Sequence, residues 1–242
     1  MNNYLINTGP ESKAEVVVDY LKSMKVSGLF ALFITDDDPG SIGGLDAVLE
    51  NFTVGYIFLP TRERMSEAYA SALESISEKS GAQLAYGPDF VDGVHSYGFG
   101  SYDGKVMKWG DSFDLYFNNE SRPNLSVLYS QGPFHFFFSG NSTSEDEAKI
   151  VQEVTSNPDF MRIMIPTTLV QSANYGKDGA TSDLLLDTLG AQTVIISVGP
   201  GDRALPSSSL IENLHEKGIE VQRTDEIGNI IYVTDGTNYW RG

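Results

Sequence analysis

The order of apolar positions in the first third of the chain is that of alternating strands and helices. Apolar runs of strand length alternate with segments whose apolar residues recur at helical spacing. Ser12 and Glu15 form a capping box that opens the first of these helices. The expected strands are 4–8, 29–35, 54–59 and 83–86, and the expected helices cover 12–24, 45–52 and 65–81. This alternation predicts βαβ units of a layered α/β fold.

The pattern changes in the middle of the chain and then returns. Short strands separated by Gly, Asn and Pro turns predict an antiparallel meander at 105–109, 112–117, 125–130 and 134–139. A second capping box, at Ser144 and Glu147, predicts the start of a helix, after which strands and helices alternate again. It continues as strand 160–165, helix 184–189, strand 193–198, helix 207–216 and strands 219–223 and 229–234. Two α/β halves thus flank a meander, and we expect a single domain over residues 1–242.

The composition argues against one class of partner, nucleic acids, but does not indicate a function. Sixteen basic residues against 33 acidic ones give a formal charge of −17 without a Lys/Arg cluster, so direct nucleic-acid binding is not expected. The chain has no cysteine, no apolar run of membrane-spanning length and no signal-peptide pattern at its start. The compartment therefore stays unknown, although an extracellular setting is compatible with the acidity.

Several motifs resemble those of the metallo-β-lactamase-fold hydrolases. Leu5–Gly9 is similar to their "LIDTG", and Thr35–Leu45 is similar to "THxDxDHIGGL". Phe138–Asn141 stands where these proteins have "FTGD", and 196–199 and 223–228 resemble a closing "ISVG" and "RTDxxG". The match is closest to the C-terminal domain of competence DNA-uptake channel (ComEC-like) proteins and covers nearly the whole chain. It implies a four-layer αββα sandwich of two mixed sheets flanked by helices.

The resemblance also implies that the metal-binding positions are degenerate. In the family, His and Asp side chains hold two metal ions that activate water. Here the first histidine is replaced by an aspartate, one aspartate is kept, and the bridging aspartate is replaced by an asparagine. The "PHHGS" motif is matched to Pro166–Leu169 and the last His-Pro to Leu205–Pro206. The degenerate positions are Asp36, Asp38, Gly40, Ser41, Asn141, Thr167, Thr168 and Leu205.

The remaining histidines do not replace the lost ligands. His95, His135 and His215 are scattered without ligand spacing, so no zinc, no dizinc hydrolysis and no catalytic residue are expected. Asp36 and Asp38 are weak candidates for an all-oxygen site for Ca²⁺ or Mg²⁺. The alternative is that Asp36 or Asp38 caps the backbone of the turn before Gly43 and Gly44.

Three hypotheses of function follow. The leading one is a catalytically inactive metallo-β-lactamase-like domain, a pseudoenzyme that acts in binding or assembly through a protein partner or self-association. The second is a metal-dependent hydrolase with an all-oxygen site around Asp36 and Asp38. The third is an extracellular surface or filament-forming subunit, suggested by the acidity and by sequons at Asn51, Asn119, Asn124 and Asn141. An aromatic, Gly-rich stretch at 86–102, expected to be an irregular loop, would present an apolar patch to a partner.

Overall fold

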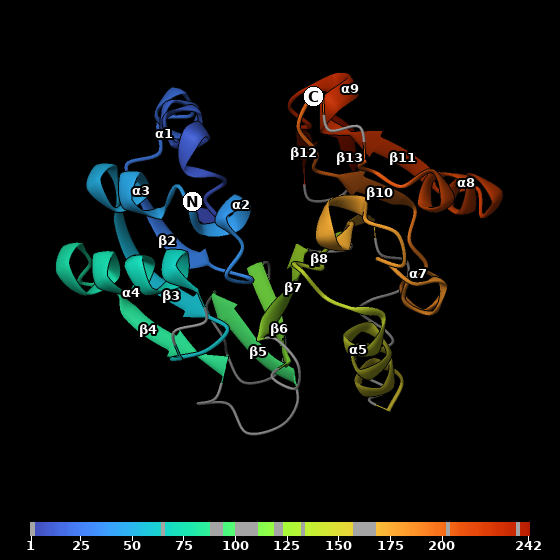
Figure 1. Ribbon diagram of the computed structural model, residues 1–242, viewed down its shortest axis with the longest axis horizontal. Helices are drawn as coiled ribbons and strands as arrows, with labels where there is room; N and C mark the ends of the chain where they lie inside the picture. The colour runs from blue at the N-terminus through green and yellow to red at the C-terminus, as the bar shows by residue number, and fades with distance from the viewer. Residues whose placement is uncertain are drawn as a thin grey trace. The chain divides into compact units, whose positions relative to one another are not determined.

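The structure is a computed structural model whose chain divides into two compact units. It describes residues 3–63, 66–87, 94–99, 111–118, 123–131, 134–156, 168–201, 204–235 and 238–242. The first unit consists of Met1–Asp92 with Phe117–Leu125, and the second of Gly93–Tyr116 with Ser126–Gly242 (Figure 1). The expected strands 105–109 and 160–165 lie outside the described residues. Each unit is treated by itself below.

The first unit is a parallel sheet covered by helices. Its strands, in the order β1-β2-β3-β4, are β1 (Tyr4–Ile6), β2 (Gly28–Phe33), β3 (Thr53–Leu59) and β4 (Gln83–Tyr86). All three strand pairs are parallel, so this described sheet is not mixed. Its helices are α1 (Ala14–Ser23), α2 (Pro39–Ile42), α3 (Leu45–Asn51) and α4 (Glu67–Lys79). Leu32 and Ile57 of the strands pack with Leu45, Tyr69 and Ile76 of the helices in one core.

Two local expectations for the first unit were wrong. The capping box at Ser12 does not form, because a 3₁₀ turn η1 (Glu11–Lys13) precedes α1, whose N-cap is Lys13 without a side-chain cap. The segment expected to be a Gly-rich turn contains the four-residue helix α2. The glycines that follow are needed for close packing: a Cβ on Gly43 would lie 2.5 Å from the Glu11 nitrogen, and one on Gly44 2.4 Å from the Thr8 carbonyl oxygen.

The second unit contains a mixed sheet of seven strands in the order β11-β10-β9-β8-β7-β6-β5. The antiparallel part has β5 (Val94–Phe99), β6 (Asp111–Asn118), β7 (Asn124–Gln131) and β8 (Phe134–Phe138), and confirms the meander strands expected at 112–117, 125–130 and 134–139. The parallel part continues through β9 (Leu169–Gln171), β10 (Thr193–Ile196) and β11 (Glu220–Arg223). A separate hairpin pairs β12 (Tyr232–Thr234) with β13 (Tyr239–Arg241).

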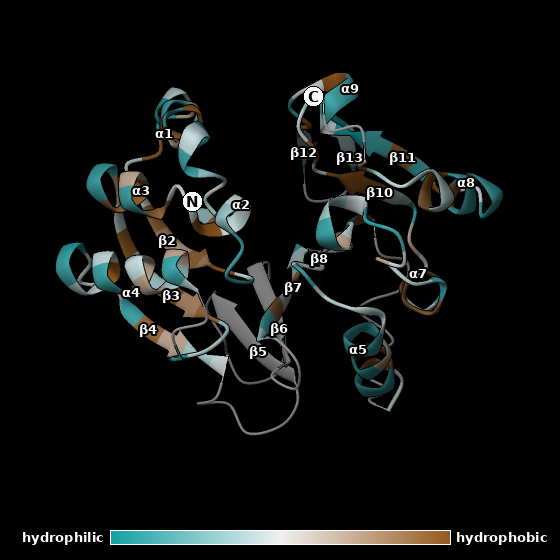
Figure 2. Ribbon diagram, in the orientation of Figure 1, coloured by the Kyte–Doolittle hydropathy of each residue, from teal (hydrophilic) through white to brown (hydrophobic). Residues whose placement is uncertain are grey.

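Helices α5 (Ser144–Ser156), α7 (Asp183–Leu189) and α8 (Ser208–Glu216) pack on this second sheet, and a short helix α9 (Thr224–Ile227) follows β11. Val170 and Val194 of the strands meet Val154, Leu185 and Leu214 of the helices in the core. Strands β2, β3 and β10 are largely hydrophobic while the outer faces of α4, α5 and α8 are largely hydrophilic, as Figure 2 shows. None of the helices in the described part has the length and apolar character that a membrane span requires.

Two expectations for the second unit were also wrong. The stretch 86–102 was expected to be an irregular loop, but its residues Val94–Phe99 form β5, paired in antiparallel register with β6. The helix at Ser144 is capped one residue earlier than expected: the Thr143 backbone N–H donates to Asp146 Oδ2 at 2.7 Å, and the Asp146 N–H donates to Thr143 Oγ1 at 3.3 Å. Glu147 is thereby free for a buried role described below.

Candidate functional site

The carboxylate of Asp36 is the centre of a hydrogen-bonded turn at the end of β2. We call Thr35–Ser41 the acid turn. Asp36 Oδ1 accepts from the Asp38 backbone N–H at 2.9 Å, and Oδ2 accepts from the hydroxyls of Thr35 at 2.5 Å and Ser41 at 3.3 Å. Asp36 is only 1% exposed. Three protein donors thus occupy most of the acceptor capacity of one carboxylate, which has about four lone-pair positions.

Asp38 holds the start of α2 from outside the helix. It is the N-cap residue, and its Oδ1 accepts from the Gly40 backbone N–H at 2.7 Å. Ser41 closes the turn, since its N–H donates to the Asp38 carbonyl at 2.8 Å. The expectation that Asp36 or Asp38 caps the backbone before the glycine pair is therefore confirmed, with Asp38 as the N-cap.

Residues of neighbouring strands fix the acid turn from both sides. Asn7, in a left-handed conformation with φ 60°, donates through Nδ2 to Thr35 Oγ1 at 2.8 Å and accepts from the Thr35 N–H at 2.9 Å. The Thr8 N–H donates to the Ser41 carbonyl at 2.7 Å, and the Leu125 N–H donates to the Thr35 carbonyl at 2.7 Å. The turn is therefore held by the backbone and side chains of the first unit.

Burial sets the electrostatics of this turn. Loss of solvent, with a smaller contribution from the charge of Asp38, raises the pKa of Asp36 above its ordinary value, while the hydrogen bonds from Thr35, Asp38 and Ser41 oppose that shift. Asp37 is also buried, and its carbonyl accepts from the Ser66 hydroxyl at 3.3 Å. The arrangement favours a carboxyl group locked in the protein interior over one presented to a ligand.

In the second unit, the carboxyl ends of β8 and β9 carry amide and hydroxyl groups. Asn141 lies in the turn between β8 and α5, and this turn meets Asn174 after β9. The Asn174 N–H donates to the Gly140 carbonyl at 3.2 Å, and its side chain donates to the Ser142 carbonyl at 2.9 Å. We call Gly140–Ser142 and Ser172–Gly176 together the amide edge. The carboxyl ends of parallel strands are where α/β folds place ligands.

Three successive left-handed residues shape the amide edge. The 3₁₀ segment η3 (Ala173–Gly176) contains Asn174 at φ 47°, Tyr175 at φ 57° and Gly176 at φ 77°. A Cβ on Gly176 would lie 2.8 Å from side-chain atoms of Ile196 and Pro206, so glycine is needed there. The sequence interpretation passed over this segment. The signal that was available is the run Leu169–Gln171, a short apolar strand followed by small and polar residues.

The other positions expected in the second unit do not join Asn141. Thr168 is buried and precedes β9, whereas Asn141 follows β8. Because Phe136 pairs with Leu169 in parallel register, the two residues lie toward opposite ends of these neighbouring strands. Leu205 packs against the hydrophobic core. Thr167 lies outside the described residues. Whether Asn141 lies near the acid turn stays a prediction, because the two belong to different units.

A buried carboxylate of the second unit also has a structural role. Glu147 Oε2 accepts from the Ser182 N–H at 2.6 Å, and Oε1 accepts from the Ser142 hydroxyl at 3.3 Å. Burial raises the pKa of Glu147, opposed by the hydrogen bonds from Ser182, Ser142 and Thr181. Glu147 therefore ties the start of α5 to the start of α7.

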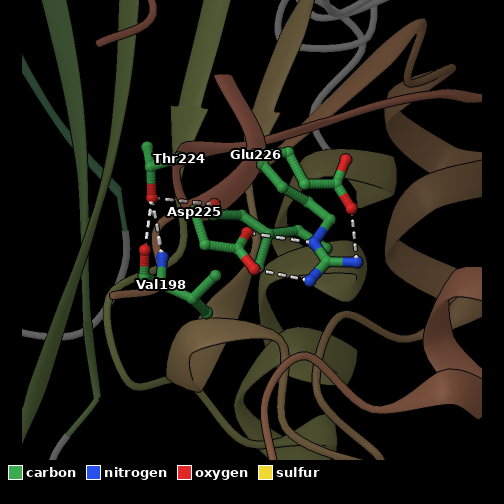
Figure 3. Close-up of polar contacts among 6 residues, drawn as sticks. Val198, Thr224, Asp225 and Glu226 are labelled. Carbon is green, nitrogen blue, oxygen red and sulfur yellow. Dashed lines mark hydrogen bonds and ion pairs between the residues drawn. The ribbon is translucent and has the colours of Figure 1, made fainter. Parts of the chain in front are cut away.

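The ends of β10 and β11 are closed in a similar way, as Figure 3 shows. Thr224 Oγ1 accepts from the Val198 N–H at 2.8 Å and lies 2.8 Å from the Val198 carbonyl oxygen, to which it donates. Arg223 donates to both carboxylate oxygens of Asp225, at 3.1 and 2.6 Å, and pairs with Glu226 at 2.8 Å. A guanidinium bound by two carboxylates is poorly placed to bind a phosphate group.

The histidines do not assemble a site either. His135 is buried in β8, with Nδ1 2.9 Å from the Ser130 hydroxyl, and burial lowers its pKa to about 4. His215 lies exposed on α8. His95 belongs to β5, paired with Leu115.

The described residues do not fit the metal centre that the sequence resemblance implies. Within this part of the chain, no three His, Cys, Asp or Glu side chains lie close enough to hold a metal ion. A catalytic zinc takes about three protein ligands. The acid turn offers Asp36, whose oxygens are engaged, and Asp38, which caps a helix, while the amide edge offers neutral groups that bind divalent cations poorly.

Comparison with known proteins identifies the fold. No protein-family profile matches the sequence, and a search of curated proteins finds no match. Among solved structures, the metallo-β-lactamase fold protein YhfI from Bacillus subtilis is similar, with a TM-score of 0.53 and 10% identity over 98% of this chain and 87% of that one. A mutant of the CmlA beta-hydroxylase is also similar, with a TM-score of 0.50 and 11% identity. The match covers 81% of this chain and 43% of the hydroxylase chain. The protein thus has the metallo-β-lactamase-like α/β sandwich fold.

Proposed function

We propose that this protein is a catalytically inactive metallo-β-lactamase-like domain that acts by binding or assembly. The observation that carries the proposal is the acid turn, in which both oxygens of the Asp36 carboxylate accept hydrogen bonds from the turn itself. A hydrolase of this fold needs metal-bound water as its nucleophile. Because nearly all metal ligands of the family are replaced, we expect the metal-bound water that acts as nucleophile to be absent, so the reaction is abolished and not merely slower.

Two finer assignments belong to the same proposal. The order of motifs supports closeness to the competence-protein branch, and the match over 98% of the chain supports one domain over residues 1–242. We further assign the positions of the paired family histidines to Asn174 and Tyr175 rather than to Thr167 and Thr168. Their location after β9, their contact with the Asn141 turn and the glycine that follows support this change.

An activity assay tests the loss of catalysis. The purified chain should hydrolyse neither phosphodiesters nor β-lactams when Zn²⁺ or Mn²⁺ is added, and neither Ser41→His nor Asn141→Asp should restore turnover, because one ligand cannot hold two metals. Metal-dependent turnover that Asp38→Ala abolishes and that the exposed control Asp187→Ala retains would instead establish the hydrolase with oxygen ligands.

The partner is proposed to be a protein or a second copy of the chain. The hairpin β12–β13 supports this, since Val233 and Trp240 are cross-strand neighbours and, with Ile231, are 41%, 48% and 39% exposed. Sedimentation should show association of the wild-type chain that Trp240→Ser weakens, whereas Leu184→Ser, at an equally exposed residue of α7, has no effect. A monomeric wild type at all concentrations would reject self-association.

Nucleic acid is not proposed as the partner. A charge of −17 without a basic stripe leaves few phosphates to be neutralised, and Arg223 is bound by carboxylates. A titration with duplex DNA at several salt concentrations should show no binding near physiological salt. Sub-micromolar affinity with a steep salt dependence would contradict this.

A further inference from the structure

A buried amide of the second unit has one hydrogen-bonding atom unaccounted for. Gln222 of β11 is 5% exposed, and among the described residues its Oε1 has no hydrogen-bond partner. Its amide donates through Nε2 to Glu220 Oε1 at 2.6 Å. The amide nitrogen thus has a partner, while the acceptor oxygen has none among the described residues. A flip of the amide would set its oxygen against the Glu220 carboxylate, so it offers no remedy.

Hydroxyl and aromatic groups of β10 and of the hairpin β12–β13 lie near this amide. Thr193 of β10 pairs in register with Glu220, and the side chains of Thr193 and Gln222 both oppose the burial that raises the pKa of Tyr232. Tyr232 and Tyr239 of the hairpin lie with ring centroids 5.9 Å apart, and the Tyr239 ring meets Phe134 edge-on at 5.1 Å. We call Thr193, Glu220, Gln222, Tyr232 and Tyr239 the tyrosine–amide cluster.

The charge of the cluster is negative and reaches the surface. Glu220 is exposed and its carboxylate contributes, after burial, to the raised pKa of Tyr232. Gln192, whose Oε1 accepts from the Tyr239 hydroxyl at 3.4 Å, is exposed beside it. Glu220 therefore presents a negative charge to solvent, hydrogen-bonded to the buried Gln222 amide. Buried acceptors without a donor are rare and call for a ligand or an ordered water.

We propose that the tyrosine–amide cluster binds a primary ammonium group. Such a group offers three N–H donors and one positive charge. The Gln222 oxygen and the Glu220 carboxylate accept two of the donors, the Tyr232 or Thr193 oxygen accepts the third, and the tyrosine rings attract the charge. A divalent metal ion fits less well, because Ca²⁺ requires about six to eight oxygen ligands. The chemistry is shared by small amines and by lysine side chains of a peptide.

Thermal unfolding of the full chain in different chloride salts tests the proposal. At equal ionic strength, n-propylammonium should raise the melting temperature saturably, whereas tetramethylammonium, which has no N–H donor, and sodium should not. Nα-acetyl-lysine amide should act like n-propylammonium if a lysine side chain can reach the cluster, and should have no effect if only small free amines can enter.

Two variants and one control locate the response. Glu220→Gln, at an exposed residue, should weaken the apparent affinity for n-propylammonium about tenfold or more, since it removes a charge-assisted hydrogen bond. Gln222→Leu should fold with undiminished stability and lose the response. Gln171→Leu, at a strand glutamine whose amide donates to Ser197 Oγ at 3.2 Å, should retain it.

Three results of these experiments would overturn the proposed ammonium binding. If the Gln222 oxygen holds only a water molecule, the three salts give coincident melting curves and the proposal is overturned. Equal stabilisation by sodium, or a Gln222→Leu response equal to that of the wild type, overturns it as well. The test does not depend on the acid turn, so it can fail while the proposed loss of catalysis stands.

Discussion

The two units contain the same strand–helix arrangement held by the same polar contacts. In the first, β2, β3 and β4 are parallel and connected through α3 and α4; in the second, β9, β10 and β11 are connected through α7 and α8. Lys79 bridges Asp46 at 2.5 Å and Glu50 at 2.8 Å. Lys217 bridges Asp187 at 2.8 Å and Asp183 at 3.7 Å. Even the neighbouring donor is matched, since Ser75 donates to Asp46 and Asn213 to Asp183.

The units differ where their strands end. The acid turn of the first unit satisfies its backbone with carboxylates, as Asp36 and Asp38 do. The amide edge of the second unit uses side-chain amides and left-handed residues, as at Asn174. Its nearby carboxylate contact is with Glu147 of α5, which accepts from the Ser142 hydroxyl and the Ser182 N–H. The comparison teaches that two different sets of polar residues can each close a strand end from within. Both sets engage polar groups at strand ends, the places where α/β folds commonly bind ligands.

The largest expected effect comes from removing the carboxylate of each unit. Asp36→Ala and Glu147→Ala should each lower the free energy of unfolding by about 3 kcal/mol, because each leaves buried donors without an acceptor. Urea unfolding measures the loss, with the exposed Asp19→Ala as the matched control. A loss below about 1 kcal/mol in one variant only would show that the units are not equivalent in this respect.

A substitution at the glycine pair should be next in size. Gly44→Ala places a Cβ 2.4 Å from the Thr8 carbonyl oxygen and should cost about 2 kcal/mol through displacement of β1 from α3. Gly81→Ala is the control, because nothing lies within 4 Å of its added Cβ. Equal stability of the two variants in urea would mean that the close approach at Gly44 is not rigid.

Acid should destabilise the second unit through His135. Burial lowers its pKa to about 4, below the value of about 6.5 in the unfolded chain. The unfolded state therefore binds more protons between these values, so this contribution to stability is full above about pH 6.5 and is lost as the pH falls toward 4. After allowance for solvent screening we expect a loss of about 1–2 kcal/mol. His135→Leu should remove this part of the pH dependence, and the exposed His215→Leu should not.

The smallest effect concerns the matched lysine bridges. Lys79→Met and Lys217→Met should each lower stability slightly and to the same extent, because both bridges are largely exposed to solvent. The difference from wild type should vanish in about 1 M salt, where screening acts over about 3 Å. A loss that persists in high salt would assign the effect to packing of the lysine stems instead.

Much of the fold could be predicted because buried strands and amphipathic helices leave periodic patterns. β4 has the predicted bounds, and α5 and α8 begin within one residue of prediction. The errors arose in segments that are too short for a period or whose composition is typical of another structure. β9 has three residues, too few for a period, and β5 contains Gly98 among aromatic residues, a composition typical of loops.

The candidate site was predictable only in part. The capping role of Asp38 follows from its position before Pro39 and Gly40, a local relationship. The contact of Asn174 with the Asn141 turn joins residues far apart in the chain, and it depends on three left-handed residues that no sequence pattern indicated. The same holds for Gln222, whose missing partner is a property of packing rather than of sequence.

Elemental analysis of the purified chain after dialysis tests the central claim most directly. The proposed loss of the metal centre predicts no stoichiometric zinc or other transition metal, in the wild type and in Asp38→Ala alike, because Asp36 and Asp38 serve the acid turn. About one tightly held transition metal per chain, lost in Asp38→Ala and retained in Asp187→Ala, would contradict the account and make the acid turn a metal site.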